Sequence, residues 1–284
     1  MKRKLLTLVS LSLLLSLAIS LVGCSQKTVD RGLPVARALA MEGEGVTHHY
    51  LVLGDSIAAH HGVEEKDSYY HLLGEALSQN GESWKGENWG VSGARVLDLL
   101  NTLREKKADP KDREALANAE LITISIGGND ILDFLRKNGV DLLENKSGDW
   151  LKTFGSIKGS IDTFCEELRG EIALVIKEIR DANPVATILF QNIYNVARDM
   201  EGKMRILGKE FTPRQLLEPV FIPIRRILEE EAKSLGYTVA DTYSAFEKSE
   251  EGSLLRPELI HPNEAGHALI CKVLFDTYQS LKAK

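Results

Sequence analysis

The sequence predicts an α/β fold in which helices cover both faces of a five-stranded parallel sheet, giving three layers. Five short apolar runs, each followed by glycine or polar residues, are typical of buried strands. The longer segments between these runs carry apolar residues at i, i+3 and i+4, which indicates helices that bury one face. Because strands and helices alternate along the chain, we expect parallel strands joined by right-handed crossovers.

Each predicted strand is a short run of apolar or β-branched residues that stops at a turn residue. The strongest is 121–126 (LITISI), which is apolar, stops at Gly127 and therefore predicts a strand buried on both faces. The first run stops at Gly54 in the same way. Residues 131–160 and 195–215 are interpreted as insertions. In chain order the predicted strands are 49–53, 85–89, 121–126, 186–193 and 237–240.

The predicted helices have one apolar face and are bounded by residues that start or stop helices. Residues 69–77 follow Asp67 and Ser68, either of which is able to cap the helix. Pro219 and Pro223 are placed to split a later helical segment. The predicted helices are 69–77, 94–103, one from about 161 to Asn183, 213–235, and one that begins near Asn263.

The N-terminus is interpreted as a targeting segment. Basic residues at 2–4 precede an uncharged stretch rich in leucine and serine at 5–23, and this stretch leads directly into Cys24. The pattern resembles a bacterial lipoprotein signal, in which the cysteine is acylated (for example by palmitate) and becomes the first mature residue. A membrane-spanning anchor is the alternative, since the stretch is nearly long enough to cross a bilayer. The frequent serines and the cysteine after glycine favour processing.

This interpretation sets the domain organisation and the location. The predicted parts are a signal peptide at 1–23, a lipidated tether at 24–46 and one folded domain at 47–284. The protein is then expected outside the cytoplasm, attached to the bacterial cell membrane by its lipid anchor.

Composition excludes several classes of protein. The net charge is −6, and the short basic clusters are interspersed with acidic residues. Both observations argue against a nucleic-acid partner. Apart from Cys24, the cysteines are Cys165 and Cys271, which lie in apolar helical patterns and are expected to be buried free thiols rather than a disulfide. The sequence has no Cys/His group with zinc spacing and no EF-hand run, so we predict no metal site and no cofactor.

Reactive polar groups gather in segments that follow predicted strands or precede the last helix, and ligands of such sheets bind beyond the carboxyl ends of the strands. Four segments have this character: Gly54-Asp55-Ser56, Gly90-Val91-Ser92-Gly93, Gly127-Gly128-Asn129-Asp130 and Glu258-Leu259-Ile260-His261-Pro262-Asn263. Together and in this order they resemble the SGNH hydrolases, also called GDSL esterases/lipases, over residues 48–280. The four positions for which that family is named are present as Ser56, Gly93, Asn129 and His261. The resemblance implies the flavodoxin-like SGNH hydrolase fold.

Physical chemistry gives these residues consistent roles. A serine hydroxyl is a weak nucleophile until a base takes its proton, and a histidine such as His261 titrates near neutral pH. The oxyanion formed by the attack of Ser56 needs preorganised donors. We expect the backbone N–H groups of Ser56 and Gly93 and the side-chain amide of Asn129 to supply three. His60 and His61 follow the nucleophile and are interpreted as exposed loop residues.

The acid that orients His261 departs from the family pattern. The family usually has aspartate three residues before the histidine, whereas this chain has Glu258. The glutamate reaches one methylene further and would hold the Nδ1–H of His261 and fix its tautomer. Two alternatives stay open, namely Asp241 after the fifth predicted strand and a backbone carbonyl that leaves a Ser–His dyad.

The predicted function is an extracytoplasmic serine esterase or lipase that hydrolyses carboxylic acyl esters through an acyl-enzyme on Ser56. The same residues would serve an esterase that removes O-acetyl groups from cell-surface or extracellular glycans. A non-catalytic surface lipoprotein is a third hypothesis, disfavoured by the intact Ser56, Asn129 and His261. The α/β-hydrolase class is excluded because Gly54-Asp55-Ser56-Ile57-Ala58 lacks the second glycine of the G-x-S-x-G motif.

Overall fold

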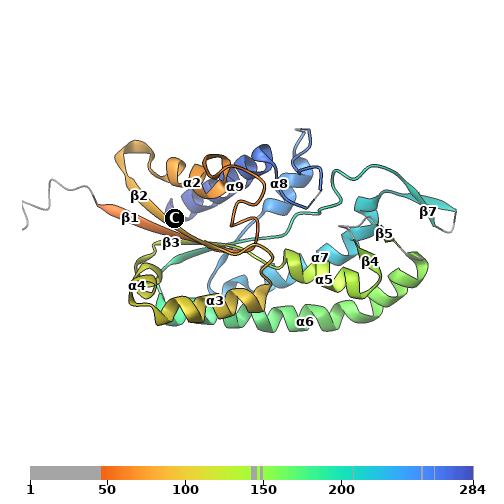
Figure 1. Cartoon of the computed structure of the whole chain (residues 1–284), viewed down its shortest axis with the longest axis horizontal. Helices are drawn as coiled ribbons and strands as arrows, with labels where there is room; N and C mark the ends of the chain where they lie inside the picture. Colours follow the sequence, from red (N-terminus) through yellow and green to blue (C-terminus); the bar gives the residue numbers. More distant parts are fainter. Residues whose placement is uncertain are drawn as a thin grey trace, which may run out of the picture. The chain divides into compact units, whose positions relative to one another are not determined.

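A five-stranded parallel sheet forms the centre of the described chain, as predicted (Figure 1). The structure is a computed structural model that describes residues 46–141, 146–147, 150–206, 208–250, 252–258 and 260–283. The predicted signal peptide and the tether up to residue 45 therefore lie outside the described residues. Within the described residues, no helix is long and apolar enough to cross a membrane.

The strands follow the order β2-β1-β3-β6-β9, and every neighbouring pair is parallel. This is the flavodoxin-like order of a doubly wound sheet, in which ligands bind beside the strands where the order reverses. Here that point lies between β1 and β3. The strands are β1 (Thr47–Gly54), β2 (Ser83–Gly90), β3 (Leu121–Ser125), β6 (Thr187–Gln191) and β9 (Thr238–Ala240).

Helices cover both faces of the sheet, which confirms the three-layer prediction (Figure 1). One face carries α2 (Tyr69–Leu77), α8 (Thr242–Lys248) and α9 (Glu264–Lys282). The other face carries α3 (Val96–Ala108), α4 (Pro110–Asn118), α5 (Gly128–Lys137), α6 (Trp150–Ala182) and α7 (Pro213–Leu235).

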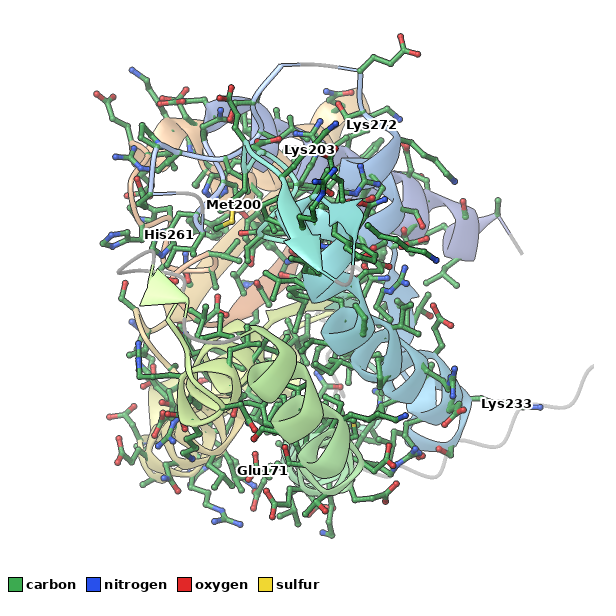
Figure 2. The ribbon with its side chains drawn as sticks, turned by 90° about the vertical axis from the view of Figure 1, so that its right-hand side faces the viewer. Glu171, Met200, Lys203, Lys233, His261 and Lys272 are labelled. Carbon is green, nitrogen blue, oxygen red and sulfur yellow. The ribbon has the colours of Figure 1, made fainter. Side chains whose placement is uncertain are left out.

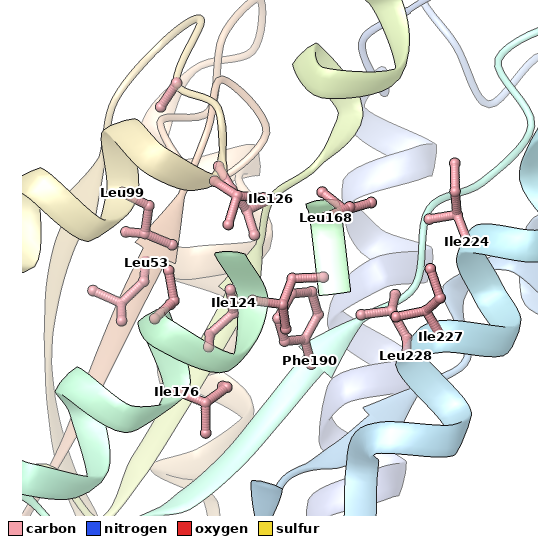
Figure 3. Packing of buried hydrophobic residues seen from close by; sticks show 14 of the residues in the cluster. Leu53, Leu99, Ile124, Ile126, Leu168, Ile176, Phe190, Ile224, Ile227 and Leu228 are labelled. Carbon is pink, nitrogen blue, oxygen red and sulfur yellow. The ribbon is translucent and has the colours of Figure 1, made fainter. Parts of the chain in front are cut away.

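The alternation of side chains along β1 divides the core into two apolar clusters. Tyr50 and Val52 pack with residues of α2 and α9, whereas Leu51 and Leu53 pack towards the opposite layer. Figure 3 shows part of the second cluster, where side chains of the sheet meet those of α6 and α7. The labelled members are Leu53, Leu99, Ile124, Ile126, Leu168, Ile176, Phe190, Ile224, Ile227 and Leu228. Because both faces of the sheet are buried, the central strands are mostly apolar, and the polar Thr123, Ser125 and Gln191 within them are buried too.

Two helix predictions have definite outcomes. The structure has α2 at the predicted bounds, and the Ser68 hydroxyl caps it by accepting the N–H of His71 at 3.1 Å. The expectation that Pro219 and Pro223 split the later segment is wrong, since α7 runs through both as one helix. Its buried apolar face stabilises the helix through tertiary packing, and Pro219 lies on the exposed face.

The two predicted insertions contain regular structure that the sequence pattern did not indicate. Residues 131–160 hold most of α5, the two-residue strands β4 (Val140–Asp141) and β5 (Lys146–Ser147), and the first turns of α6. Residues 195–215 hold an antiparallel hairpin and the start of α7. The hairpin strands are β7 (Met204–Ile206) and β8 (Lys209–Phe211). Two 3-10 turns, Glu65–Asp67 and Gln79–Gly81, complete the assignment.

Candidate active site

The candidate nucleophile lies in a tight turn directly after β1. A side chain at Gly54 (φ 141°) would overlap the carbonyl oxygen of Ser125, so only glycine lets β1 lie this close to the end of β3. Asp55 is buried, and its Oδ1 accepts the N–H of Ile57 at 3.0 Å. Burial raises the pKa of Asp55 to about 7. The N–H of Asp55 also donates to the Ser125 carbonyl at 2.9 Å, so the residues on either side of Ser56 are held by hydrogen bonds.

The neighbouring strand β2 supports this turn from the side. The Asn88 amide nitrogen donates to the carbonyl oxygen of Ala58 at 2.7 Å, and the Asn88 oxygen accepts the N–H of Gly90 at 2.8 Å. A side chain at Gly90 would overlap the backbone of Ala59. The role of Asn88 was not predicted, although a polar residue within a predicted strand and just before a glycine was a usable signal.

The structure brings His261 to Ser56, with 3.0 Å between Nε2 and the hydroxyl oxygen. Figure 2 labels His261 among the side chains of the chain. His261 lies on a loop before α9 that is closed like a short hairpin. The N–H of Arg256 donates to the His261 carbonyl at 2.9 Å, and the N–H of Asn263 donates to the Leu254 carbonyl at 3.0 Å. Asn263 then caps α9 by accepting the N–H of Gly266. The start of the helix therefore fixes the position of the histidine.

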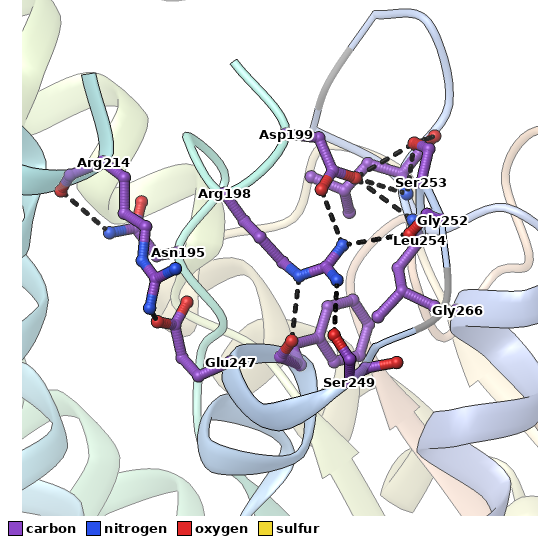
Figure 4. Close-up of polar contacts among 12 residues, drawn as sticks. Asn195, Arg198, Asp199, Arg214, Glu247, Ser249, Gly252, Ser253, Leu254 and Gly266 are labelled. Atoms are coloured by element: carbon purple, nitrogen blue, oxygen red, sulfur yellow. Dashed lines mark hydrogen bonds and ion pairs between the residues drawn. The ribbon is translucent and has the colours of Figure 1, made fainter. Parts of the chain in front are cut away.

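A second set of contacts anchors this histidine loop to the segment after β6 (Figure 4). The Arg198 guanidinium donates to the carbonyl oxygens of Phe246 and Ser249 at 2.8 and 3.1 Å. Asp199 pairs with Arg198 and accepts the backbone N–H of Leu254 at 3.1 Å. Arg198 and Asp199 lie in a segment interpreted as an insertion, and their role was not predicted because no local pattern marks a contact across 48 or more residues.

The three predicted oxyanion donors lie on turns at the same edge of the sheet. Within the described chain, the N–H groups of Ser56 and Gly93 make no hydrogen bond. Gly93 has φ 82°, and a side chain there would meet nothing within 4 Å, so its backbone is open to a ligand. Asn129 lies in the first turn of α5 and donates through Nδ2 to the Ala94 carbonyl at 2.9 Å. The positive end of α5 adds to a site suited to negative charge.

Comparison with known proteins decides the family. The model of the GDSL-like lipase/acylhydrolase family matches residues 52–269. The chain belongs to this family. It is also 25% identical over 283 residues to the uncharacterized protein YpmR of Bacillus subtilis (strain 168), with 95% of each chain covered.

Solved structures of other proteins share the fold of this GDSL-like hydrolase. The lipase Lip_vut3 from a goat rumen metagenome matches with a TM-score of 0.60 and 19% identity, over 80% of this chain and 95% of the lipase. A phospholipase A1 from Streptomyces albidoflavus NA297 matches with a TM-score of 0.58 and 18% identity, over 82% and 99% of the two chains.

The acid beside the histidine of this GDSL-like hydrolase is Glu258. Its Oε1 lies 3.4 Å from His261 Nδ1, but the two atoms are not aligned for a hydrogen bond, and buried Nδ1 makes none within the described residues. The same Oε1 accepts Arg256 Nε at 2.8 Å. Asp241 instead caps α8 and accepts the Asn192 amide at 2.8 Å. The geometry favours Glu258 over Asp241, and its orienting role stays a prediction.

The surroundings of His261 favour the neutral imidazole. Burial lowers the pKa of His261, and so does the nearby ring of His61, whereas Glu258 opposes the shift. The two histidine rings lie 4.5 Å apart between centroids. The interpretation of His61 as an exposed loop residue is confirmed, but its contact with His261 was missed. A neutral imidazole is the form that accepts a proton from serine.

Ser56, Asn129 and His261 line a cavity of about 40 Å³. Its other walls are mainly apolar and include Ile131, Leu132, Ile193, Val196, Phe221 and Ile260. A larger groove of about 450 Å³ lies between α5 and α6, but neither Ser56 nor His261 lines it. The reactive groups, rather than the size of the hollow, identify the candidate site.

Two other predictions concern metals and cysteines. Within the described ranges, no group of histidine, cysteine, aspartate and glutamate side chains is arranged to hold a metal ion. Cys165 and Cys271 are buried free thiols, as expected. Burial raises the pKa of each thiol to about 11, which keeps both protonated at neutral pH.

Proposed function

We propose that this chain is a serine esterase that hydrolyses carboxylic acyl esters through an acyl-enzyme on Ser56. The observation that carries the proposal is the 3.0 Å contact between Ser56 Oγ and His261 Nε2 in a member of the GDSL-like family. An unactivated serine and an isolated histidine do no chemistry of this kind, whereas the pair does.

The proposed reaction has two steps, acylation of Ser56 and hydrolysis of the acyl-enzyme. Ser56 Oγ bonds to the ester carbonyl carbon while His261 Nε2 takes the hydroxyl proton, and the carbonyl oxygen becomes an oxyanion facing Ser56 N–H, Gly93 N–H and the Asn129 amide. The oxyanion collapses, the carbon–oxygen bond to the alcohol breaks, and His261 returns its proton to the departing alcohol. Water then attacks the carbonyl carbon of the acyl-serine while His261 takes its proton. The carbon–oxygen bond to Ser56 breaks as His261 gives that proton to Ser56 Oγ, which releases the acid.

A fluorophosphonate probe tests the nucleophile, because it bonds covalently to activated serines. The soluble domain from about residue 27 should be labelled and should hydrolyse a short ester, and Ser56→Ala should abolish both. Ser92→Ala, at an exposed position beside Gly93, is the matched control and should keep labelling. Full activity of Ser56→Ala would end the proposal, whereas a parent chain that neither labels nor hydrolyses esters would leave the non-catalytic hypothesis. EDTA should leave the rate unchanged, since the proposed steps use no metal.

The small cavity favours a second candidate within the same chemistry, an esterase for short acyl groups such as O-acetyl groups on extracellular glycans. A water-sized group needs roughly 10–15 Å³ of such space, so the 40 Å³ beside Ser56 has room for a short acyl group such as acetyl. Hydrolysis rates on a panel of esters from acetate to long-chain acids decide between a short-acyl esterase and a lipase. Acetylated glycans are tested as a separate set of substrates. Rates that peak at acetate favour the short-acyl enzyme, and rates that rise with chain length favour a lipase.

We also propose that the enzyme works outside the cytoplasm on a lipid anchor at Cys24. The sequence at 1–24 supports this, with its basic start, its uncharged stretch and its cysteine after glycine. Cys24→Ala should block lipid attachment and leave an uncleaved precursor or a secreted form. Mass spectrometry that finds an unmodified mature N-terminus at another position would contradict the anchor.

A further inference from the structure

Arg256 makes contacts with both halves of the candidate site. Its Nε donates to Glu258 Oε1 at 2.8 Å, and its Nη1 donates to the carbonyl oxygen of Gly62, in the loop that follows Ser56. Its backbone N–H donates to the carbonyl of His261 at 2.9 Å. One residue therefore links the loop of the nucleophile, the orienting acid and the histidine.

The loop after Ser56 is shaped to receive this side chain. Gly62 has φ 90°, and a Cβ atom there would lie only 2.6 Å from Arg256 Cδ. Any larger residue would therefore displace the arginine as well as strain the backbone. The guanidinium lies over Gly62 because glycine leaves the space.

Glu258 needs such support. Its side chain is 39% exposed and ends 3.4 Å from His261 Nδ1, whereas the 2.8 Å bond of Oε1 is to Arg256. An exposed glutamate has three side-chain torsions and loses rotamer entropy when it is held in one place. Partial burial tends to raise the pKa of Glu258, but a bond from its own backbone N–H and the Arg256 guanidinium lower it overall. The carboxylate is thus kept charged and in place by the arginine.

We infer that Arg256 is a positioning residue that holds the Glu258 carboxylate beside His261 Nδ1 and ties the histidine loop to the nucleophile turn. The inference rests on the proposed esterase function. It gives a physical reason why glutamate serves in place of the usual aspartate. The longer side chain has one more torsion, and the guanidinium restrains it. When His261 takes the serine proton, the carboxylate already lies next to the imidazolium.

The kinetic test is a double-mutant cycle on Arg256 and Glu258, measured as kcat and KM on a short ester. Arg256→Gln should lower kcat by about tenfold and leave KM nearly unchanged, because the carboxylate acts mainly in the transition state. In the Glu258→Gln background the same change should lower kcat less than about twofold, since only the contact of Arg256 with the Gly62 carbonyl is then left to lose. Arg256→Lys keeps the charge without the planar fork and should recover part of the loss. Arg104→Gln, which breaks an exposed pair with Glu178 on the other side of the sheet, should leave kcat unchanged.

A titration by NMR tests the same coupling without activity. The titratable or charged groups near His261 are His61, Glu258 and Arg256, with His267 on α9. Since Glu258 raises the pKa of His261, Glu258→Gln should lower it in the parent chain and should lose most of this effect in the Arg256→Gln background.

The outcomes separate the two proposals. A parent chain that neither hydrolyses esters nor labels at Ser56 overturns the proposed function, and the titration then still decides the role of Arg256. Equal losses of kcat in both backgrounds, together with an unchanged effect of Glu258→Gln on the His261 titration, overturn the inference. So does an Arg256→Gln effect confined to KM, which would make the arginine a substrate-binding group.

Discussion

The side-chain amide of Asn88 donates a 2.7 Å hydrogen bond to the carbonyl oxygen of Ala58 and so joins β2 to the turn that carries Ser56. The same side chain accepts the N–H of Gly90. Asn88 therefore satisfies a carbonyl and an N–H where β2 packs against the turn. Its two bonds link strand stability to the position of the nucleophile.

Asn88→Ala should destabilise the domain and slow the reaction together. Losing both bonds leaves partly buried groups unsatisfied, at a cost of about 1–3 kcal/mol. For a domain of this size, that should lower Tm by roughly 2–4 °C for each kcal/mol. Asn118→Ala removes an exposed asparagine at the end of α4 and serves as the matched control. Equal Tm and kcat in the two variants would show that the turn does not depend on Asn88.

Asn129→Ala should lower kcat by about 10²–10³, because it removes one donor to the oxyanion. The loss should appear in kcat more than in KM, since the oxyanion exists only in the transition state and the intermediate. Asn138→Ala, at the C-terminus of the same helix, controls for damage to α5. A change confined to KM would mean that Asn129 binds the ground state and does not serve the oxyanion.

The midpoint of the acidic side of the pH–rate profile should give the pKa of His261. The base must be neutral, so kcat/KM rises as pH passes above the pKa of His261. Because burial and the His61 ring lower this pKa, the midpoint should fall below the ordinary value of 6.5. Removing the neighbouring ring with His61→Gln should raise the midpoint, whereas His71→Gln, on the exposed face of α2, should leave it in place. A midpoint that His61→Gln leaves unchanged would contradict this electrostatic contact.

The fold was predictable wherever local signals agreed with tertiary packing. Residues 69–77 combine one apolar face with the Ser68 cap, and the observed helix has these bounds. The run 121–126 is buried, and residues 121–125 form β3 in the centre of the sheet. Where the helix propensity of a segment was weak, the helix was not predicted. Residues 131–160 were interpreted as an insertion, whereas α5 begins at Gly128 and is stabilised by burial of Ile131, Phe134 and Leu135.

Some residues of the candidate site could be predicted from the sequence, and others could not. Sequence motifs indicated Ser56 and His261, since their chemistry needs particular residue types, and the structure places the two side chains in contact. Asn88, Arg198 and Arg256 were missed because each acts through hydrogen bonds to the backbone of a distant segment. Every residue has a backbone carbonyl oxygen with the same chemistry. The sequence therefore does not indicate which carbonyl accepts a hydrogen bond from a given side chain.

Glu258→Gln should lower kcat by roughly 10–10³ and leave KM nearly unchanged, because the carboxylate stabilises the imidazolium and fixes its tautomer only as the reaction proceeds. We expect less than the full 10⁴ seen for an aligned acid, since Oε1 lies 3.4 Å from Nδ1 and is shared with Arg256. Glu258→Asp should retain more activity than Glu258→Gln if charge matters more than reach. His261→Ala should be far worse than either variant.

Asp241→Asn is the decisive comparison, measured by kcat and Tm in parallel with Glu258→Gln. Asp241 caps α8 and accepts the Asn192 amide, so its variant should lose about 0.5–2 kcal/mol of stability with little change in kcat. Suppose instead that Glu258→Gln is silent and Asp241→Asn stops the reaction. The orienting acid would then be Asp241, which requires the histidine loop to move from the position that the Leu254 and Asp199 contacts now hold. Silence in both variants would leave a Ser56–His261 dyad.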